Sequence, residues 1–270
     1  MPSNPKKELS LITAGDVFGN CCCRTLLSSA KTIFPVIRLT IMLAYIGAVI
    51  VVLPTSLWLY SRISSKKPQI YAKVDGSLLV RVKNNVPAVQ KVYRKPWWCP
   101  FGDVQTIVNG TLRSCPSLPF VRELIEFADG GALGIDWLYA DDCKEDAPIV
   151  LFLPGITGSS TDCSYILYPA QEVYARKWRA IVYNPRGLGG VQLRNKIAYN
   201  SARHDDVAEV IERVHSRYPK AKIIGCGFSM GGMVLWNYLA TRTAESAVLS
   251  GAMIVSAPFD PLSTTTSLEV

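Results

Sequence analysis

A serine between two glycines, with an apolar run on each side, constrains the fold of this chain more than any other feature. Residues 222–240 contain Gly227-Phe228-Ser229-Met230-Gly231, which follows the pattern G-x-S-x-G. A serine on a tight strand-to-helix turn has strained backbone angles, and glycines two positions away let the strand and the helix close. The pattern predicts Ser229 as a nucleophile at a helix N-terminus, where free N–H groups favour negative charge. An ordinary glycine-rich turn is the alternative.

Strand-like and helix-like segments surround this motif. Residues 120–127 and 132–139 are two extended runs joined by Asp129-Gly130-Gly131, which predicts an antiparallel hairpin. Residues 148–153 are apolar throughout, as expected of a central strand that is covered on both faces. Further strands are predicted at 180–184, 222–228 and 247–256. A helix is predicted at 165–178, and an amphipathic one runs through Val207, Val210, Ile211 and Val214. This alternation predicts an α/β fold with a mostly parallel, doubly wound sheet.

The charge distribution argues against nucleic acid as a partner. The total net charge is +8, but residues 1–67 hold eight Lys or Arg and two acidic residues, which leaves +2 for the other 203 residues. The basic character therefore belongs to the N-terminal segment, and the body of the protein carries no nucleic-acid footprint.

The N-terminal part predicts a membrane anchor. Residues 39–61 form 23 uncharged residues, long enough to cross the hydrocarbon core of a bilayer, and Trp58 and Tyr60 suit its interface. A cleaved signal peptide and a buried core helix are the alternatives. The basic residues on the two sides nearly balance, so the positive-inside rule leaves the orientation open. We expect a flexible basic tail at 1–38, a transmembrane helix at 39–61, a linker with irregular cover at 62–119, and the α/β domain at 120–270.

The cysteines indicate neither a disulfide framework nor a metal site. Cys21-Cys22-Cys23 precede the apolar segment without a C-x₂-C pair, which suits reversible palmitoylation better than metal binding. The other five are scattered along the chain and are expected to be mostly buried apolar residues. No metal ligands and no cofactor are expected.

Four motifs in order resemble one known family. They are Pro154-Gly155-Ile156-Thr157-Gly158, Asn184-Pro185-Arg186-Gly187, the serine motif continued to Gly232, and Ser256-Ala257-Pro258-Phe259-Asp260. Together they resemble the branch of α/β-hydrolase-domain-containing proteins that includes members 1, 2 and 3, over about residues 90–270. The resemblance implies an α/β-hydrolase fold, and a membrane anchor before it is typical of these proteins. It also implies a serine hydrolase that acts on lipid carboxylic esters, of the phospholipase, acylglycerol esterase or acetyl esterase type.

The resemblance also assigns roles to individual residues. Ser229 would attack the ester carbonyl and form an acyl-enzyme, while the N–H groups of Met230 and Ile156 would hold the oxyanion. Gly155 beside Ile156 lets the backbone turn inward, although an ordinary strand-to-helix turn is the alternative for this loop. Gly227 and Gly231 would be the glycines of the serine turn.

The usual acid and histidine of such a triad have no clear candidates in the sequence. The expected order is Ser, then Asp or Glu, then His, and residues 230–270 contain no histidine. His204 and His215 both lie upstream, where a cap or loop contact and a helix-end position are the simpler interpretations. Asp260 is a fallback acid. We therefore expect a fragment or splice form whose sheet is incomplete at the C-terminus.

Two functions from different classes follow from this reading. The first is a single-pass membrane hydrolase of the endoplasmic reticulum or another endomembrane, with membrane lipids or another ester as substrate. The second is a catalytically impaired form that serves as a scaffold for binding lipid or protein. The sequence leaves the oligomeric state open.

Overall fold

The computed structural model describes residues 14–72, 76–243 and 246–268. The chain divides into two units, residues 1–105 and 106–270, and each is described by itself. The first thirteen residues of the expected tail lie outside the described residues.

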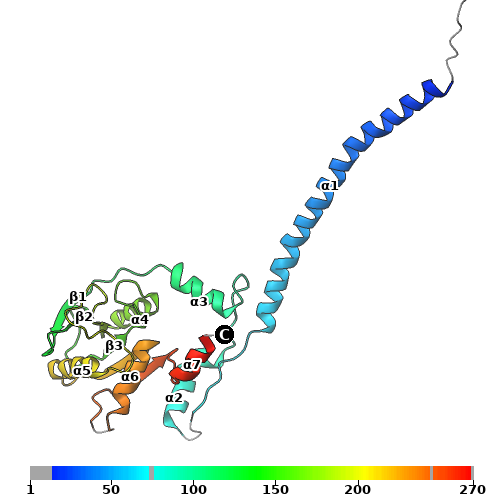
Figure 1. Ribbon diagram of the computed structural model, residues 1–270. Coiled ribbons are helices and arrows are strands. Elements are labelled where there is room, and N and C mark those ends of the chain that lie inside the picture. The colour runs from blue at the N-terminus through cyan, green and yellow to red at the C-terminus, as the bar shows by residue number, and fades with distance from the viewer. Residues whose placement is uncertain (1–13, 73–75, 244–245, 269–270) are drawn as a thin grey trace, which may run out of the picture. The chain divides into compact units, whose positions relative to one another are not determined.

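The first unit begins with a long helix, α1, over Ala14–Ile63 (Figure 1). Residues 14–38, which we expected to belong to a flexible tail, are helical. Extending an existing helix adds one hydrogen bond per residue without a new nucleus, and no proline interrupts residues 14–34. The predicted apolar segment at 39–61 lies within α1. One candidate membrane span within this helix is Phe34–Ile63, which is 30 residues long and contains an 18-residue window with a mean hydropathy of 2.5.

The segment predicted as irregular cover contains short helices. These are α2 over Ser77–Asn85, the 3₁₀ helix η1 over Pro87–Gln90, and α3 over Gly102–Thr111. Proline fits the first position of η1, because the N–H group that it lacks would have no helical acceptor there. Residues 91–101 and 112–119 contain neither helix nor strand, as the proline content of this region predicts.

The second unit holds one six-stranded sheet with the order β1-β2-β4-β3-β5-β6. The antiparallel pair β1–β2 is the predicted hairpin, β2 is antiparallel to β4, and β4, β3, β5 and β6 run parallel. The mostly parallel α/β sheet predicted from the sequence is confirmed. The strands are β1 Val121–Glu126, β2 Ala132–Leu138, β3 Ile149–Leu153, β4 Arg179–Asn184, β5 Ile223–Phe228 and β6 Gly251–Val255.

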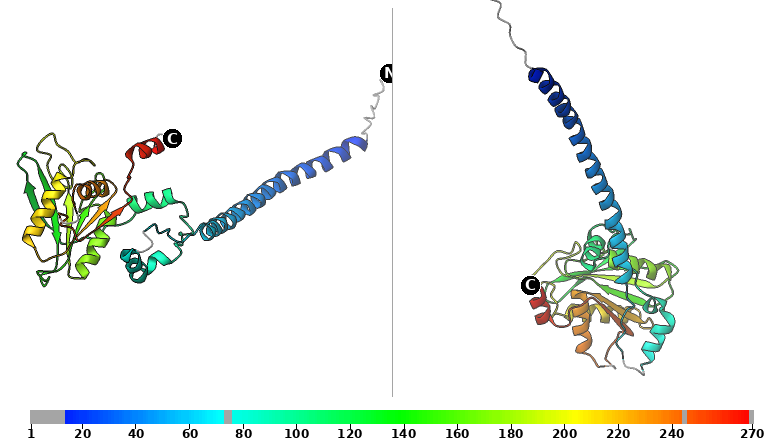
Figure 2. Two further views of the ribbon diagram at one scale, coloured as in Figure 1. Left: turned by 90° about the horizontal axis from the view of Figure 1, so that it is seen from below. Right: turned by 90° about the vertical axis from the view of Figure 1, so that its right-hand side faces the viewer.

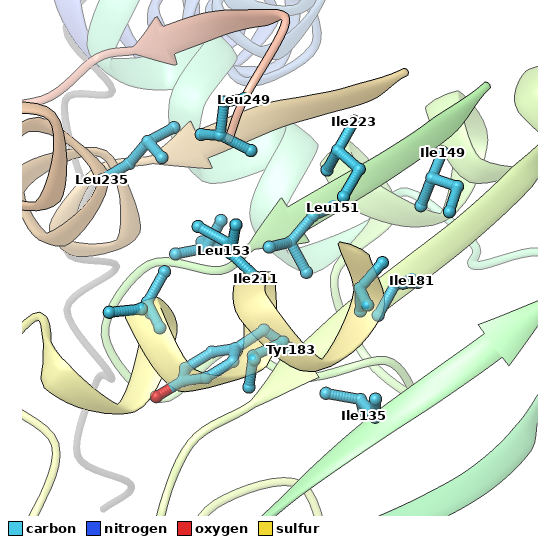
Figure 3. Close-up of a cluster of buried hydrophobic side chains, with 14 of the residues drawn as sticks. Ile135, Ile149, Leu151, Leu153, Ile181, Tyr183, Ile211, Ile223, Leu235 and Leu249 are labelled. Atoms are coloured by element: carbon cyan, nitrogen blue, oxygen red, sulfur yellow. The ribbon is translucent and has the colours of Figure 1, made fainter. Parts of the chain in front are cut away.

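Helices cover both faces of this sheet and can be followed in Figure 2. Strand β3 shows the two layers, because its alternate side chains enter different cores. Leu151 and its neighbours on the same face pack with α5 (Asp205–Arg217) and α6 (Met230–Ala240), as Figure 3 shows in part. Val150 and Phe152 face the other way and pack with α4 (Ser164–Ala175). The last helix is α7, Pro261–Leu268.

A buried arginine ties the hairpin turn to the start of α5. Arg186, two residues after the end of β4, makes a two-pronged ion pair with Asp206 (2.6 and 2.8 Å) and a third bond to Asp129 (2.7 Å). Its side chain is 2% exposed and lies over the Phe127 ring at 4.4 Å. A Cβ at Gly131 would lie 1.9 Å from Nη1 of Arg186, so the glycine makes room for the guanidinium. The hydrogen bond that Arg186 Nη1 donates to Asp129 Oδ2 holds the pKa of Asp129 below its usual range.

Candidate active site

Ser229 stands on the turn between β5 and α6 in a strained backbone conformation. Its φ is 50° and its ψ is −118°, a backbone conformation that residues other than glycine rarely adopt. The turn is held by two backbone hydrogen bonds, from Ser229 N to Val255 O (2.9 Å) and from Met233 N to Ser229 O (3.1 Å). The serine is exposed. Strain of this kind is kept where the surroundings enforce it, commonly at functional sites.

The two glycines beside the serine are sterically required. A Cβ at Gly227 would lie 2.6 Å from the carbonyl oxygen of Gly231 and 2.7 Å from Cα of Gly232. A Cβ at Gly231 would lie 2.4 Å from the carbonyl oxygens of both Leu153 and Pro154. All of these contacts are with backbone atoms, which cannot rotate away. The absence of a side chain lets α6 start against β5 and against the end of β3.

The loop after β3, residues 154–160, lies against the serine. A Cβ at Gly155 would be 3.2 Å from Cβ of Ser229, so the two backbones approach closely at that point. Thr157 has φ 62°, an unusual value for a β-branched residue. We call residues 154–160 the oxyanion loop, after the role predicted for Ile156.

Most backbone N–H groups of the oxyanion loop donate hydrogen bonds to other described residues, but two in its centre do not. Gly155 N–H donates to the Tyr165 hydroxyl (3.3 Å), Gly158 N–H to Gly155 O (3.2 Å), and Ser160 N–H to Asn184 Oδ1 (3.0 Å). Among the described residues, the N–H groups of Ile156 and Thr157 have no acceptor. An N–H group in such a position is free to bind an anion, as the role predicted for Ile156 requires.

The start of α6 supplies the second group of free donors. The first N–H groups of a helix have no carbonyl oxygen four residues earlier within the helix, and Met230 is the first residue of α6. The helix dipole adds a partial positive charge at the same point. The predicted donors, Met230 and Ile156, therefore belong to two segments that both border Ser229. Their catalytic role stays a prediction.

In the described part of the chain, neither the two histidines nor Asp260 forms a hydrogen bond with Ser229. His204 precedes α5, and its Nε2 lies 3.3 Å from the Thr241 hydroxyl. His215 lies in the last turn of α5. Asp260 caps α7, with its Oδ1 accepting from the amides of Leu262 (3.1 Å) and Ser263 (3.2 Å). Among the described residues, Ser229 Oγ has no hydrogen bond to a histidine or a carboxylate.

Two groups that hold the oxyanion loop were missed by the sequence analysis. The first is Tyr165, whose ring packs on Phe228 (centroids 5.0 Å apart) while its hydroxyl meets the loop, and burial raises the pKa of that hydroxyl. The second is a buried polar cluster around Asp136. A charged residue in the middle of the apolar run 132–139 was the one signal that could have indicated the cluster.

Comparisons with known proteins show what this chain is similar to. Residues 148–268 match the family described as the alpha/beta hydrolase fold. The protein abhd-3.2 of Caenorhabditis elegans is 50% identical over 227 residues, which cover 84% of this chain and 60% of that protein. Phospholipase ABHD3 of Homo sapiens is 36% identical over 194 residues, covering 70% of this chain and 47% of that protein.

Solved structures give a similar match. A soluble variant of monoglyceride lipase from Saccharomyces cerevisiae aligns with a TM-score of 0.46 and 15% identity, over 58% of this chain and 51% of that one. The chain spans about half the length of the curated relatives it matches, from 47% to 60% for the two proteins above.

Proposed function

This chain has the α/β-hydrolase fold and is a relative of the α/β-hydrolase-domain-containing proteins, and from that premise we propose that it is a serine hydrolase of lipid carboxylic esters. The observation that carries the proposal is the strained, exposed Ser229 between two sets of free backbone N–H groups. A nucleophile and an anion site at one point are what acyl transfer needs. The names of the relatives, a phospholipase among them, support a lipid ester as the substrate.

The first step is attack of Ser229 Oγ on the ester carbonyl carbon. The Oγ–C bond forms, the carbonyl π electrons move to oxygen, and the resulting oxyanion accepts hydrogen bonds from Met230 N–H and Ile156 N–H. Removing one such donor from a serine hydrolase costs about 2.7–4 kcal/mol in the transition state. Collapse of the intermediate expels the alcohol and leaves an acyl-enzyme, which water then hydrolyses to the acid and free Ser229.

The proton of Ser229 Oγ needs an acceptor in this step. In the part of the chain that the structure describes, neither His204 nor His215 forms a hydrogen bond with Ser229. When one member of a triad is missing, the anion site and substrate binding still give about 10³–10⁴-fold acceleration over water. A small diffusible base should raise the rate further, because general base catalysis contributes about 10²–10⁴-fold.

Addition of imidazole tests the proposal on the chain itself. We expect hydrolysis of p-nitrophenyl butyrate by the purified chain to rise with imidazole concentration and to exceed that of Ser229→Ala by at least about tenfold. The measurement is the initial rate with the rate of imidazole alone subtracted. A fluorophosphonate probe should label the wild-type chain in the presence of imidazole and leave Ser229→Ala unlabelled.

Ser246→Ala is a suitable control, since Ser246 is another exposed serine and its hydrogen bonds are local to residues 243–246. It should hydrolyse and label like the wild type. Equal rates and equal labelling for the wild type and Ser229→Ala would contradict the hydrolase proposal. That outcome would favour the scaffold alternative, in which the fold binds lipid or protein without turnover.

We also propose that α1 anchors the chain in a membrane as a single span, in the endoplasmic reticulum or another endomembrane. The support is the uncharged stretch at 39–61 within the candidate span Phe34–Ile63. We expect the full chain to stay in the pellet when membranes are extracted with alkaline carbonate. Val49→Asp and Val52→Asp together should release it, because each acidic residue at the centre of a span costs about 2.5–3.5 kcal/mol of insertion. Retention of the double variant in the pellet would argue against this anchor.

A further inference from the structure

A buried polar cluster lies behind the oxyanion loop. It consists of Asp136 on β2, Asn184 at the end of β4 and Ser160 at the end of the loop, and we call it the loop anchor. We propose that the loop anchor is a positioning site, which holds the oxyanion loop so that Ile156 N–H can bind the oxyanion beside Ser229. The catalytic part of this inference rests on the proposed function.

The three residues of the loop anchor are joined to one another by three hydrogen bonds. Asn184 Oδ1 accepts from Ser160 N–H (3.0 Å), and Asn184 Nδ2 donates to Asp136 Oδ2 (3.0 Å). The Ser160 hydroxyl donates to the same Asp136 oxygen. Asn184 is fully buried, Asp136 is 3% exposed and Ser160 is 4% exposed. A loop residue is thus fixed by its amide and its hydroxyl to two different strands.

Arg122 on β1 completes the charge balance of the loop anchor. Its Nε and Nη2 reach Asp136 Oδ1 and Oδ2, both at 2.6 Å. A buried carboxylate needs such a partner, since an unpaired charge is costly to bury. Arg122 also donates to the carbonyl oxygen of Gly189. Asp136 Oδ2 therefore accepts hydrogen bonds from Arg122, Ser160 and Asn184 together. Arg122 Nη2 also lies 3.4 Å from the Ser160 hydroxyl, so the guanidinium neutralises the carboxylate and belongs to the same network.

The opposite end of the oxyanion loop is fixed as well. The Tyr165 hydroxyl accepts from Gly155 N–H (3.3 Å), and the Tyr199 hydroxyl donates to Pro154 O (3.3 Å). With both ends tied, the segment between them has few ways to move, and its free amides lie at Ile156 and Thr157. The exact position of a donor such as Ile156 N–H matters, because displacing a group in an active site by about 1 Å can lower the rate about 10²-fold.

A polar cluster of this kind is not needed merely to close the sheet. Apolar residues fill the neighbouring core positions of the same strands, including Ile135, Trp137 and Val182. A fully satisfied buried network fixes one arrangement of the groups that it joins, which a purely apolar contact does less well. Both the amide and the hydroxyl of Ser160 are used in this way, so the network fixes the path of the backbone at the end of the loop.

Hydrogen exchange tests the loop anchor without relying on catalysis. In Asn184→Ala, Ser160 N–H loses its acceptor, and we expect amide exchange in residues 154–161 to quicken at least about tenfold relative to the wild-type chain. Ile181→Ala is the matched control, because Ile181 is a fully buried residue on the same strand whose side chain lies on the opposite face of the sheet from Asn184. This control variant should speed amide exchange around the substituted position and leave the exchange rates of residues 154–161 within about twofold of wild type.

Ser160→Ala is the milder second variant. It removes only the hydroxyl and keeps the hydrogen bond that Ser160 N–H donates to Asn184 Oδ1. In the imidazole-assisted assay, we expect both loop-anchor variants to lower kcat about tenfold or more with little change in KM, because the oxyanion forms only in the transition state. Ile181→Ala should leave kcat close to wild type.

The outcomes separate the two proposals. Unchanged exchange at 154–161 in Asn184→Ala, or the same pattern as in Ile181→Ala, would overturn the loop anchor. Quickened exchange with an unchanged kcat would overturn its positioning role. If the wild-type chain shows no Ser229-dependent hydrolysis, the proposed function fails, and the exchange result still decides whether the anchor holds the loop.

Discussion

Replacing Gly231 by alanine is expected to destabilise the second unit by at least about 3 kcal/mol, at the upper end of what overpacking costs. In an ordinary helix the same change stabilises by about 1 kcal/mol, since alanine loses less conformational entropy than glycine. Here the sign reverses, because the new Cβ would lie 2.4 Å from two carbonyl oxygens at the end of β3. The helix can accept it only by moving away from the sheet. Thermal or urea unfolding of the purified full chain would measure the loss.

Gly251→Ala is the matched control for this change. Gly251 is the first residue of β6, and nothing lies within 4 Å of the position of its missing Cβ. We expect the control to unfold within about 0.5 kcal/mol of the wild type, as for surface substitutions in general. Gly227→Ala should behave like Gly231→Ala, with its Cβ 2.6 Å from Gly231 O. Equal stability of Gly231→Ala and Gly251→Ala would show that the turn does not need a bare backbone there.

The sheet could be predicted closely because its signals are local. The hairpin predicted at 120–127 and 132–139 is β1 and β2, and the apolar run 148–153 contains β3. Each strand is marked by a short apolar run, each turn by glycine or proline, and α5 by apolar residues at helical spacing. The serine turn was found for the same reason, since both its glycines and its flanking elements lie within nineteen consecutive residues.

Element boundaries and distant contacts could not be read in this way. The sixth strand was predicted at 247–256, but β6 is Gly251–Val255, because pairing with β5 decides where it starts. The helix α3 has no strong periodic signal, and residues 14–38 lack the apolar periodicity from which their helix could have been predicted. The tail, span and domain limits inferred from the sequence remain predictions where the structure does not contradict them.

The sequence predicted only those parts of the candidate site that we propose to act directly on the substrate. Ser229 and the two predicted donors follow from a motif and from the loop after β3. The loop anchor joins residues 24 to 48 positions apart in the chain, which no local pattern can pair. The motif Asn184-Pro185-Arg186-Gly187 is an example of the difference. The sequence marks it as a unit, whereas the structure shows that Asn184 and Arg186 serve separate buried networks.

The second large effect is expected at Arg186. In Arg186→Met, the side chain keeps its approximate volume, but Asp206 loses both of its short ion-pair bonds and remains buried with a side-chain exposure of 8%. Removing one partner of a buried ion pair typically costs about 3–5 kcal/mol, because the other charge is left uncompensated. Arg203, whose Nε lies 3.4 Å from Asp206 Oδ1 and whose side chain is 27% exposed, would compensate only part of that charge. The bond to Asp129 in the hairpin turn is lost as well. We expect a loss of this size in the free energy of unfolding, and early opening of the β1–β2 turn and the first turn of α5 in hydrogen exchange.

Arg213→Met provides the comparison that isolates burial. Arg213 pairs with Glu209 on the outer face of α5 at 2.6 Å, as close as Arg186 lies to Asp206, but the two side chains are 50% and 41% exposed. A surface pair of this kind contributes about 0.3–0.5 kcal/mol, so the variant should unfold almost like the wild type. A double variant, Arg186→Met with Asp206→Leu, should recover part of the loss, because it removes the orphaned charge together with its partner. If Arg186→Met costs no more than Arg213→Met, the buried arginine does not hold the hairpin to α5.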